Sequence, residues 1–285
     1  MSKFILCVLV SLSIINAQDI VRIMSFNFPT AKQNQWEKIG TTLKVIDNPK
    51  QDRLKSAEKI IQGYIPTFVC FQETHKPDIQ NFLKNDFIKA HYNSYAPSIN
   101  NKDSETNAIF YSKDYNLIDK GIIFLNEKQK KGLKSWDDNH QRACTWIFVQ
   151  NKIKPMEKFY IFNIHLGLTK TAKDNGLKII YEKANILKSQ GINSFIAGDF
   201  NMRPETVISS IQSYNFVIIR NAISSDKIFG PEFTYSGYDG KSKKTLDHII
   251  VSIPEKIKPL EFRTITNSGA RPSDHFPIMA TIQLI

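Results

Sequence analysis

The stretch Arg271-Pro272-Ser273-Asp274-His275-Phe276-Pro277 runs into the last strand-like segment of the chain, at 276–282. It places a carboxylate and an imidazole next to each other at a strand end. A second stretch, Ala197-Gly198-Asp199-Phe200-Asn201, closes another apolar run with an acid and an amide. Metal-assisted hydrolysis of a phosphoester uses groups of these kinds. The two stretches therefore predict a hydrolytic site at the ends of strands.

Two more strand ends carry polar groups, in Phe71-Gln72-Glu73-Thr74 and in Asn163-Ile164-His165-Leu166-Gly167. Glu73 is expected at a sheet edge, where a hard cation such as Mg²⁺ takes one or two carboxylates. Asp199 and Asn201 are two residues apart, so their side chains lie on one side of an extended chain. There a carboxylate can deprotonate a water molecule and an amide can hold it.

Each of these residues also has a structural interpretation when it is taken alone. Glu73 is then a solvated charge, the segment 198–201 is an Asx turn, and His165 is a structural histidine. Asp274-His275 and Asp247-His248 add two acid–imidazole pairs, in which one group can bind metal while the other donates to phosphate. Polar groups at so many strand ends favour a catalytic site over coincidence.

The hydrophobic pattern predicts an α/β fold. Strands are expected at 21–27, 68–72, 108–111, 145–149, 159–166, 195–197, 246–251 and 276–282, and helices at 52–62 and 176–189. The polar stretch 29–51 is expected to be loop with some helix. Strand, helix and strand with polar ends occur twice, at 21–73 and 159–201. This predicts two similar halves in a four-layer α/β sandwich, with two packed mixed β-sheets and helices on the outer faces.

The N-terminal residues 1–17 have the pattern of a cleaved signal peptide. Lys3 precedes an apolar run from Phe4 to Ile15, and Ala17 offers a small residue for cleavage. The run is shorter than the ~20 residues that a membrane-spanning helix needs. A buried N-terminal strand or helix is the alternative to a signal peptide. We expect a secreted or lumenal protein with no integral membrane segment in the mature chain, in which 18–285 form a single monomeric domain.

Composition favours a globular protein with a basic surface. The chain has 285 residues, of which 41% are hydrophobic, and a net charge of +11. A basic balance favours phosphate-bearing partners such as nucleic acid or an anionic lipid surface. Two lysine-rich loops are expected to border the cleft, with solvated loops as the alternative; they carry Lys128, Lys130, Lys131, Lys134, Lys241, Lys243 and Lys244. Cys70 and Cys144 are expected to be buried free thiols, with a disulfide as the alternative.

Seven segments, taken in order, resemble the motifs of the endonuclease/exonuclease/phosphatase superfamily, the deoxyribonuclease I-like fold. They are Met-Ser-Phe-Asn (24–27), Gln-Glu (72–73), Asn-Ala-Ile-Phe-Tyr (107–111), Asn-Ile-His-Leu (163–166), Gly-Asp-Phe-Asn (198–201), Leu-Asp-His-Ile (246–249) and Ser-Asp-His-Phe-Pro (273–277). Any one of them is a weak match, but together they cover nearly all of the mature chain. The resemblance implies a metal-dependent phosphoester hydrolase that forms no covalent intermediate.

The resemblance also implies a metal site and a phosphate site. Asn27, Glu73 and Asp274 match the metal-site residues, with Mg²⁺ as the expected ion and Mn²⁺ as a possible substitute. Arg142, in Arg-Ala-Cys-Thr-Trp, matches a position near the phosphate. His165 matches a residue that binds the phosphate or the leaving group.

The remaining implied roles belong to the acid–base machinery. Asp199 matches the residue that activates or orients water, and Asn201 matches its positioning partner, which also binds phosphate. Asp247 matches the acid that orients His275. His275 would stabilise the pentavalent phosphate.

The sequence departs from the family pattern at three places. Pro29 stands where some members carry an acid, and Ile-His-Leu-Gly (164–167) replaces the frequent Thr-His-Leu-Asp. Lys-Thr-Leu-Asp (244–247) lacks the Trp-Cys-Asp-Arg signature, which counts against the inositol polyphosphate phosphatase branch.

The sequence favours a secreted nuclease that acts on DNA or RNA. The first alternative is a phospholipid diesterase of the sphingomyelinase kind, which would need exposed aromatic residues. Candidates are Phe229, Phe233, Tyr235 and Tyr238, for which packing within loops is the competing interpretation. A catalytically degenerate binding protein is the second alternative, and the intact acids and imidazoles argue against it.

Overall fold

The computed structural model describes residues 19–29, 35–39, 42–46, 50–100, 105–237, 240–266 and 272–285, and for the elements within 35–51 the course of the backbone. The predicted signal peptide and Tyr238 lie outside the described residues. None of the described helices combines the length and the apolar character that crossing a bilayer requires.

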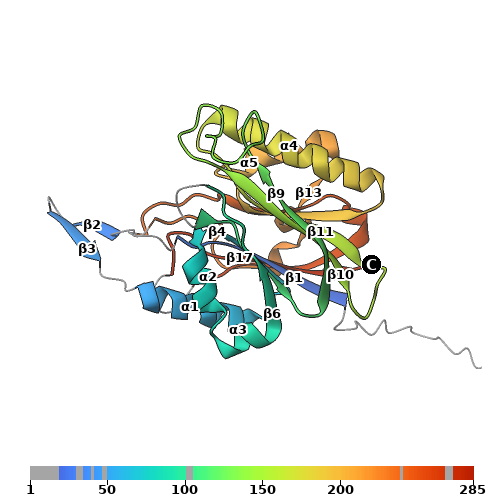
Figure 1. Ribbon diagram of the computed structural model, residues 1–285, viewed down its shortest axis with the longest axis horizontal. Helices are drawn as coiled ribbons and strands as arrows, with labels where there is room; N and C mark the ends of the chain where they lie inside the picture. The colour runs from blue at the N-terminus through green and yellow to red at the C-terminus, as the bar shows by residue number, and fades with distance from the viewer. Residues whose placement is uncertain are drawn as a thin grey trace, which may run out of the picture.

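Two large mixed sheets form the centre of the molecule (Figure 1). The first has the order β14 (Ile228–Phe229), β16 (Ile257–Thr264), β17 (Ile278–Leu284), β1 (Ile20–Asn27), β4 (Phe68–Gln72), β8 (Ile109–Ser112) and β6 (Tyr92–Tyr95). The second has the order β13 (Val217–Ile218), β15 (Asp247–Val251), β12 (Asn193–Asp199), β11 (Lys158–His165), β10 (Ala143–Asn151) and β9 (Tyr115–Phe124). Two small pairs accompany them: β2 (Gln35–Ile39) with β3 (Thr42–Ile46), and β5 (Thr74–His75) with β7 (Glu105–Thr106).

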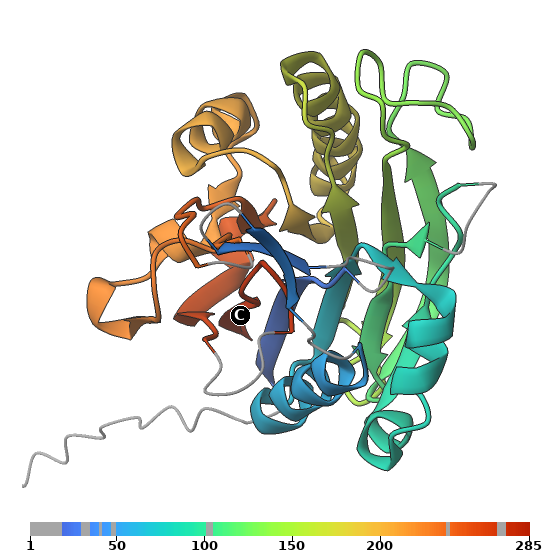
Figure 2. The same ribbon diagram turned by 90° about the vertical axis from the view of Figure 1, so that its left-hand side faces the viewer.

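Helices cover both outer faces, which makes four layers. Helices α1 (Lys50–Tyr64), α2 (Lys76–Phe82) and α3 (Asp86–His91) lie on the first sheet, and α4 (Lys170–Ser189) and α5 (Pro204–Ile211) on the second (Figures 1 and 2). One apolar core fills the space between the sheets, and one further core lies under each helical layer. The predicted four-layer sandwich is confirmed.

The two predicted halves are present as two parallel strand pairs. β1 pairs in parallel with β4 across α1, and β11 pairs in parallel with β12 across α4. Parallel strands joined through a helix carry their carboxyl ends to the same edge of a sheet. Antiparallel strands complete each sheet. The amino ends of β15 and β17 therefore lie at the same edge as the carboxyl ends of β12 and β1.

The prediction of loop with some helix at 29–51 is wrong in part. The described backbone there forms the antiparallel strands β2 and β3, and helix α1 begins at Lys50. The sequence analysis also missed β6, β9, β16, α2, α3, α5 and the two-residue strands β5, β7, β13 and β14. β16 contains Pro259 and a register shift beside it, which hides the strand pattern. The short helices α2 and α3 are six or seven residues long, too short to show a helical period.

The two cysteines are buried free thiols. Cys70 lies in the core between the sheets, and Cys144 lies in the core under α4 and α5. Burial raises the pKa of both thiols, so neither is a nucleophile at neutral pH.

Candidate active site

Strand alternation places the polar residues of the site directly above the core between the sheets. In β1, Val21 and Ile23 face this core, and Asn27 follows them on the same side of the strand. In β12, Phe195 and Ala197 face it, and Asp199 follows. The same period carries His165 of β11 and Asp247 of β15 to this edge, where all of these side chains meet.

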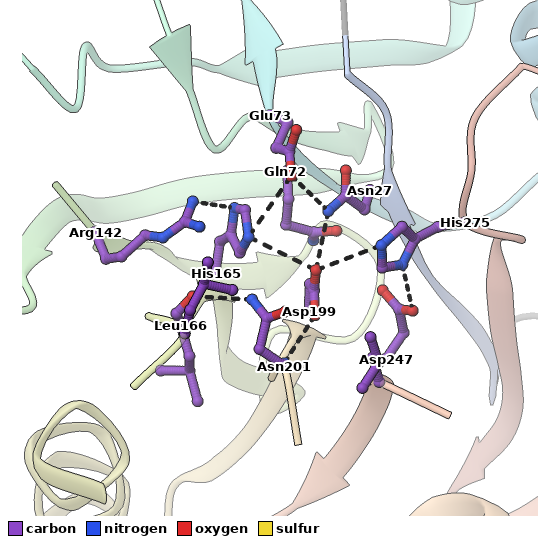
Figure 3. Close-up of polar contacts among 12 residues, drawn as sticks. Asn27, Gln72, Glu73, Arg142, His165, Leu166, Asp199, Asn201, Asp247 and His275 are labelled. Carbon is purple, nitrogen blue, oxygen red and sulfur yellow. Dashed lines mark hydrogen bonds and ion pairs between the residues drawn. The ribbon is translucent and has the colours of Figure 1, made fainter. Parts of the chain in front are cut away.

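A pocket of about 800 Å³ opens at this edge. Seven of the nine predicted site residues line it: Glu73, Arg142, His165, Asp199, Asn201, Asp274 and His275. The other two, Asn27 and Asp247, are buried immediately behind the lining and contact it through hydrogen bonds (Figure 3). The structure therefore brings all nine together.

Asp247 contacts His275, the residue that it was expected to orient. Nδ1 of His275 lies 2.8 Å from Oδ2 of Asp247, and Thr234 donates its hydroxyl to the same oxygen at 2.6 Å. Nε2 of His275 lies 3.7 Å from Oδ2 of Asp199. Burial alone would lower the pKa of His275, but the two carboxylates outweigh it and raise the pKa to about 10. His275 is therefore a buried imidazolium at neutral pH.

Asp199 is held by donors on both oxygens. Asn27 donates from Nδ2 to Oδ2 at 3.0 Å, and the backbone N–H of Asn201 donates to Oδ1 at 2.8 Å. Burial raises the pKa of the Asp199 carboxyl, His275 opposes the rise, and the balance brings the pKa to about 7. A carboxylate with this pKa can accept a proton near neutral pH, which is what a general base requires.

A glycine lets Asp199 lie beside His165. Gly198 has φ +155, and a Cβ there would lie 2.0 Å from the carbonyl oxygen of Ile164. Any other residue would push β12 away from β11, whose pairing sets Asp199 opposite His165. Asn201 has φ 50, a left-handed conformation that asparagine tolerates, and donates from Nδ2 to the carbonyl of Leu166 at 3.1 Å.

Arg142 and His165 form the opposite wall of the pocket. Nη1 of Arg142 lies 2.9 Å from Nδ1 of His165. Burial first, and then the charges of Arg142 and His275, hold the pKa of His165 well below its usual value. Arginine only donates, so the neutral ring carries its proton on Nε2. That N–H faces Glu73 Oε1 at 3.7 Å and Asp199 Oδ2 at 3.6 Å.

Asn27, Glu73 and Asp274 fit the metal site that was predicted for them. Nδ2 of Asn27 donates to Oε1 of Glu73 at 3.1 Å, while its buried Oδ1 has no hydrogen-bond partner among the described residues. Burial raises the pKa of Asp274, and the negative charge of Glu73 adds to the rise. Oxygen ligands that repel one another and an unpartnered buried amide oxygen suit a hard divalent cation.

Asp199, Asp247 and His275 also lie close enough to hold an ion, since one ligand atom of each falls within 4.8 Å of the others. Their atoms are already engaged, however, because Nδ1 of His275 contacts Asp247 and both oxygens of Asp199 accept hydrogen bonds. The imidazolium supplies the positive charge between the carboxylates. These three residues are therefore suited to proton transfer and to stabilising negative charge, rather than to binding a metal ion.

The loops around the pocket differ in part from expectation. Of the lysines expected to border the cleft, Lys244 lines the pocket, and the others are exposed on the surrounding loops. Phe233 packs against Phe276 with ring centroids 5.9 Å apart, and Tyr235 lies 5.0 Å from the His275 ring. Phe229, in β14, is exposed at 40%, so the packing of Phe233 and Tyr235 alone favours loop packing over an exposed aromatic hairpin.

The sequence analysis missed one part of the pocket wall. Asn139, His140 and Gln141, from the loop between β9 and β10, line the pocket beside Arg142. His140 contacts the buried Asp138. The only available signal was the short spacing of an aspartate and a histidine, because a loop has no hydrophobic period.

The family model described as Endonuclease/Exonuclease/phosphatase family matches residues 46–275. The chain belongs to the endonuclease/exonuclease/phosphatase family. No curated protein matches the sequence.

Solved structures of this family share the fold. An endonuclease/exonuclease/phosphatase family protein from Bacteroides thetaiotaomicron is 20% identical, with a TM-score of 0.78, and the match covers 93% of this chain and 98% of that one. The mannosyl-6-phosphatase Bt3783 of the same organism is 20% identical, with a TM-score of 0.76 over 93% and 99% of the two chains. The catalytic domain of human Nocturnin, solved with a bound sulfate anion, is 18% identical, with a TM-score of 0.70 over 94% and 95%. These likenesses show the fold, and membership of the family makes the chain a hydrolase of phosphoesters.

Proposed function

We propose that this family member is a metal-dependent phosphodiesterase that cleaves nucleic acid by direct attack of water. The observation that carries the proposal is the environment of Asp199. Its carboxylate lies 3.7 Å from the imidazolium of His275 and accepts hydrogen bonds on both oxygens, at the base of an open pocket. This arrangement pairs a base with a fixed positive charge.

Each residue has a role that its contacts support. Asp199 accepts the proton of the attacking water, and Asn201, whose side-chain amide is anchored to Leu166, positions that water. The imidazolium of His275 stabilises the negative charge that develops on the phosphate. The Nε2–H of His165 and the guanidinium of Arg142 bind phosphate oxygens from the opposite wall. No cysteine or serine nucleophile is involved.

The residues Asn27, Glu73 and Asp274 would hold the cation, which we propose to be Mg²⁺, with Mn²⁺ able to replace it. A divalent ion at this position supplies Lewis-acid polarisation of a phosphate oxygen. Asn27 has a second role in the protein itself, because its Nδ2 joins Glu73 to Asp199 through two hydrogen bonds.

Nucleic acid as substrate is supported by charge. The chain carries +11, Lys244 lines the pocket, and the other predicted lysines are exposed. A polyanion that neutralises several such charges on binding releases counterions, which gives affinity without sequence preference.

A second candidate substrate is the phosphomonoester of a small polyhydroxylated molecule. Beyond the catalytic residues, much of the pocket lining is hydrogen-bonding side chains, such as Asn100, Glu105, Asn139 and Gln141, and Tyr235 is its one aromatic residue among those described. Nucleobases are commonly held by aromatic stacking, which this lining offers sparsely. The sphingomyelinase alternative has less support, because Phe233 and Tyr235 pack against neighbouring rings and only Phe229 is exposed among the described candidates.

One panel of substrates tests these proposals. The purified protein with Mg²⁺ would be offered duplex DNA, single-stranded RNA, poly(A), a sugar phosphate, and sphingomyelin vesicles. Cleavage of DNA or RNA is the expected result. Turnover of the sugar phosphate or of sphingomyelin alone would replace the nuclease proposal with the corresponding alternative.

We propose in addition that the protein is secreted or lumenal. The support is the sequence of residues 1–17, in which a positive residue precedes a short apolar run that ends at Ala17.

A further inference from the structure

We propose that His140, oriented by Asp138, is a substrate-binding residue that contacts a phosphate adjacent to the scissile one. This inference rests on the proposed action on nucleic acid, whose strand carries a phosphate on each side of the bond that is cleaved. It is carried by an acid–imidazole pair in the loop between β9 and β10, separate from the pair formed by Asp247 and His275.

Asp138 is a buried anchor, with 3% of its surface exposed. Its Oδ1 accepts the backbone N–H of His140 at 2.9 Å and lies 2.6 Å from Nδ1 of the His140 ring. Its Oδ2 accepts the backbone N–H of Leu168. Burial would raise the pKa of this carboxyl, but the hydrogen bonds from Leu168 and His140 outweigh it and hold the pKa at about 2. Asp138 is therefore a negative charge at the Nδ1 edge of the ring.

The Nδ1 edge of the His140 ring is held by Asp138, and the Nε2 edge has no such partner among the described residues. The side chain of His140 is 51% exposed and lines the pocket with Arg142 and His165. Because Asp138 occupies Nδ1, the Nε2 atom is left for a ligand, and it has no hydrogen-bond partner within the described part of the chain. With Nδ1 turned to Asp138, a ring that carries a proton on both nitrogens donates from Nε2 to a phosphate oxygen.

Hydrogen bonds within the loop hold this pair in place. The backbone N–H of Ser135 donates to the carbonyl of His140 at 2.9 Å, and that of Asp138 donates to the carbonyl of Ser135 at 2.9 Å. The backbone N–H of Arg142 donates to the hydroxyl of Ser135 at 3.2 Å. One compact turn therefore positions both His140 and Arg142, which reaches His165.

Gly167 makes room for the anchor. A Cβ at this position would lie 2.6 Å from Oδ2 of Asp138 and 2.6 Å from Cβ of Ala172. The Asp138 carboxylate thus fills the space where a residue at 167 would carry its side chain. This accounts for the Ile-His-Leu-Gly departure seen in the sequence: the chain gives up a side chain after the His165 strand and gains an oriented imidazole in the pocket.

The Asp138–His140 pair repeats the geometry of Asp247 and His275. In both, Nδ1 of the ring meets a buried carboxylate, at 2.6 Å and 2.8 Å. The two rings differ in burial, since His275 is buried among the reacting groups whereas His140 lies exposed at the wall. This difference assigns His140 to substrate binding rather than to the chemical step.

The test compares two phosphodiesters. A short single-stranded oligonucleotide carries adjacent phosphates, and bis(p-nitrophenyl) phosphate carries only the scissile one. His140→Ala should raise KM for the oligonucleotide about tenfold, the size expected for one lost charge-assisted hydrogen bond, with kcat within about twofold. For bis(p-nitrophenyl) phosphate both constants should stay unchanged. His140→Lys should recover most of the affinity, and His91→Ala, which removes a histidine of α3 outside this pocket, should match the wild type.

Binding measured without turnover gives an independent readout. With a fluorescent oligonucleotide in chelator at pH 6, His140→Ala should reduce the slope of log affinity against log salt by about 0.7, the value for one phosphate contact on a single strand. An unchanged slope together with an unchanged KM would overturn the proposal.

A double-mutant cycle tests the role of Asp138 and Gly167. Asp138→Asn and Gly167→Ala should each raise KM for the oligonucleotide, and each should have little further effect when His140 is already alanine. Additive losses would show that they act separately from His140 and would overturn the positioning role of Asp138. If the wild type cleaves bis(p-nitrophenyl) phosphate but no oligonucleotide, the nucleic-acid function fails and this proposal fails with it. Cleavage of the oligonucleotide with no effect of His140→Ala would leave the function intact and refute the binding role alone.

Discussion

Nε2 of His275 and Oδ2 of Asp199 lie 3.7 Å apart at the base of the pocket. The pKa values of both side chains are raised, but by different causes. Burial raises the pKa of Asp199 to about 7, whereas the carboxylates of Asp247 and Asp199 raise that of His275 to about 10. Near neutral pH, Asp199 exchanges a proton while His275 remains charged. The pair therefore divides into a base and a stabilising cation.

The first prediction concerns this division of roles. Asp199→Asn should lower kcat by about 10²-fold or more, because an amide cannot accept the proton of the attacking water. His275→Ala should lower kcat by about 10²–10³-fold through the loss of a charge held near the transition state. Steady-state kinetics with circular dichroism would check both, and a folded Asp199→Asn protein with wild-type turnover would refute the assignment.

The second prediction concerns pH. Asp199 must be ionised to act as a base. We therefore expect kcat/KM to increase as pH is raised through about 7, the pKa of Asp199. His275 stays protonated across this range because its pKa is about 10. The rise should disappear from the residual activity of Asp199→Asn. A wild-type profile that is flat from pH 5 to pH 9 would contradict the role of Asp199 as a base.

The sequence indicated polar residues that gather at the pocket, but it left out several strands at the edges of the sheets. Asp199, His165 and Asn27 each end an apolar run with a two-residue period, and that period alone places them on the face toward the other sheet. Their meeting across two sheets could be inferred only from the resemblance, since pairing between distant strands leaves no local pattern.

The sequence analysis missed the edge strand β9 because of its exposure. β9 has most of its residues partly or fully exposed, so it lacks the buried run that reveals β4 or β12. Asp138 and His140 were missed because a loop positions them through backbone hydrogen bonds, which depend on the folded turn rather than on residue type. Loops that line a pocket are where sequence patterns carry least information.

The third prediction concerns the metal. Activity should be lost in excess chelator and restored by Mg²⁺ or Mn²⁺, because Asn27, Glu73 and Asp274 offer hard oxygen ligands. Glu73→Gln should raise the Mg²⁺ concentration needed for half-maximal activity, with little change in the free energy of unfolding. Glu182→Gln, an exposed residue of α4, is the matched control. Full activity of the wild type in chelator would exclude the metal proposal.

The fourth prediction concerns the N-terminus. The mature protein isolated from its native source should begin at Gln18, because Lys3 and the apolar run fit a cleaved signal. Intact-mass spectrometry measures this directly. A mass that includes Met1 to Ala17 would show that the segment is retained.

The last prediction concerns two buried amides that join the sheets beneath the pocket. Nε2 of Gln72, in β4, donates to Oδ1 of Asn163, in β11, at 2.8 Å. Nδ2 of Asn163 donates to the carbonyls of Phe71 at 2.8 Å and Ala108 at 2.9 Å. Both amide side chains are fully buried. They form a polar layer between the apolar core and the site.

Asn163→Leu keeps the branched shape of the side chain but removes these hydrogen bonds. The free energy of unfolding should fall by about 2 kcal/mol, since a buried polar group left without a partner costs ~1–3 kcal/mol. Turnover should fall as well, because Gln72 precedes Glu73 and Asn163 lies two residues before His165, so a shift between the sheets moves both walls of the pocket. Asn116→Leu, on the exposed side of β9, should change stability by less than about 0.5 kcal/mol. Urea denaturation with kinetics on the same samples would decide the matter: full stability in Asn163→Leu would show that the amide layer does not hold the sheets in register.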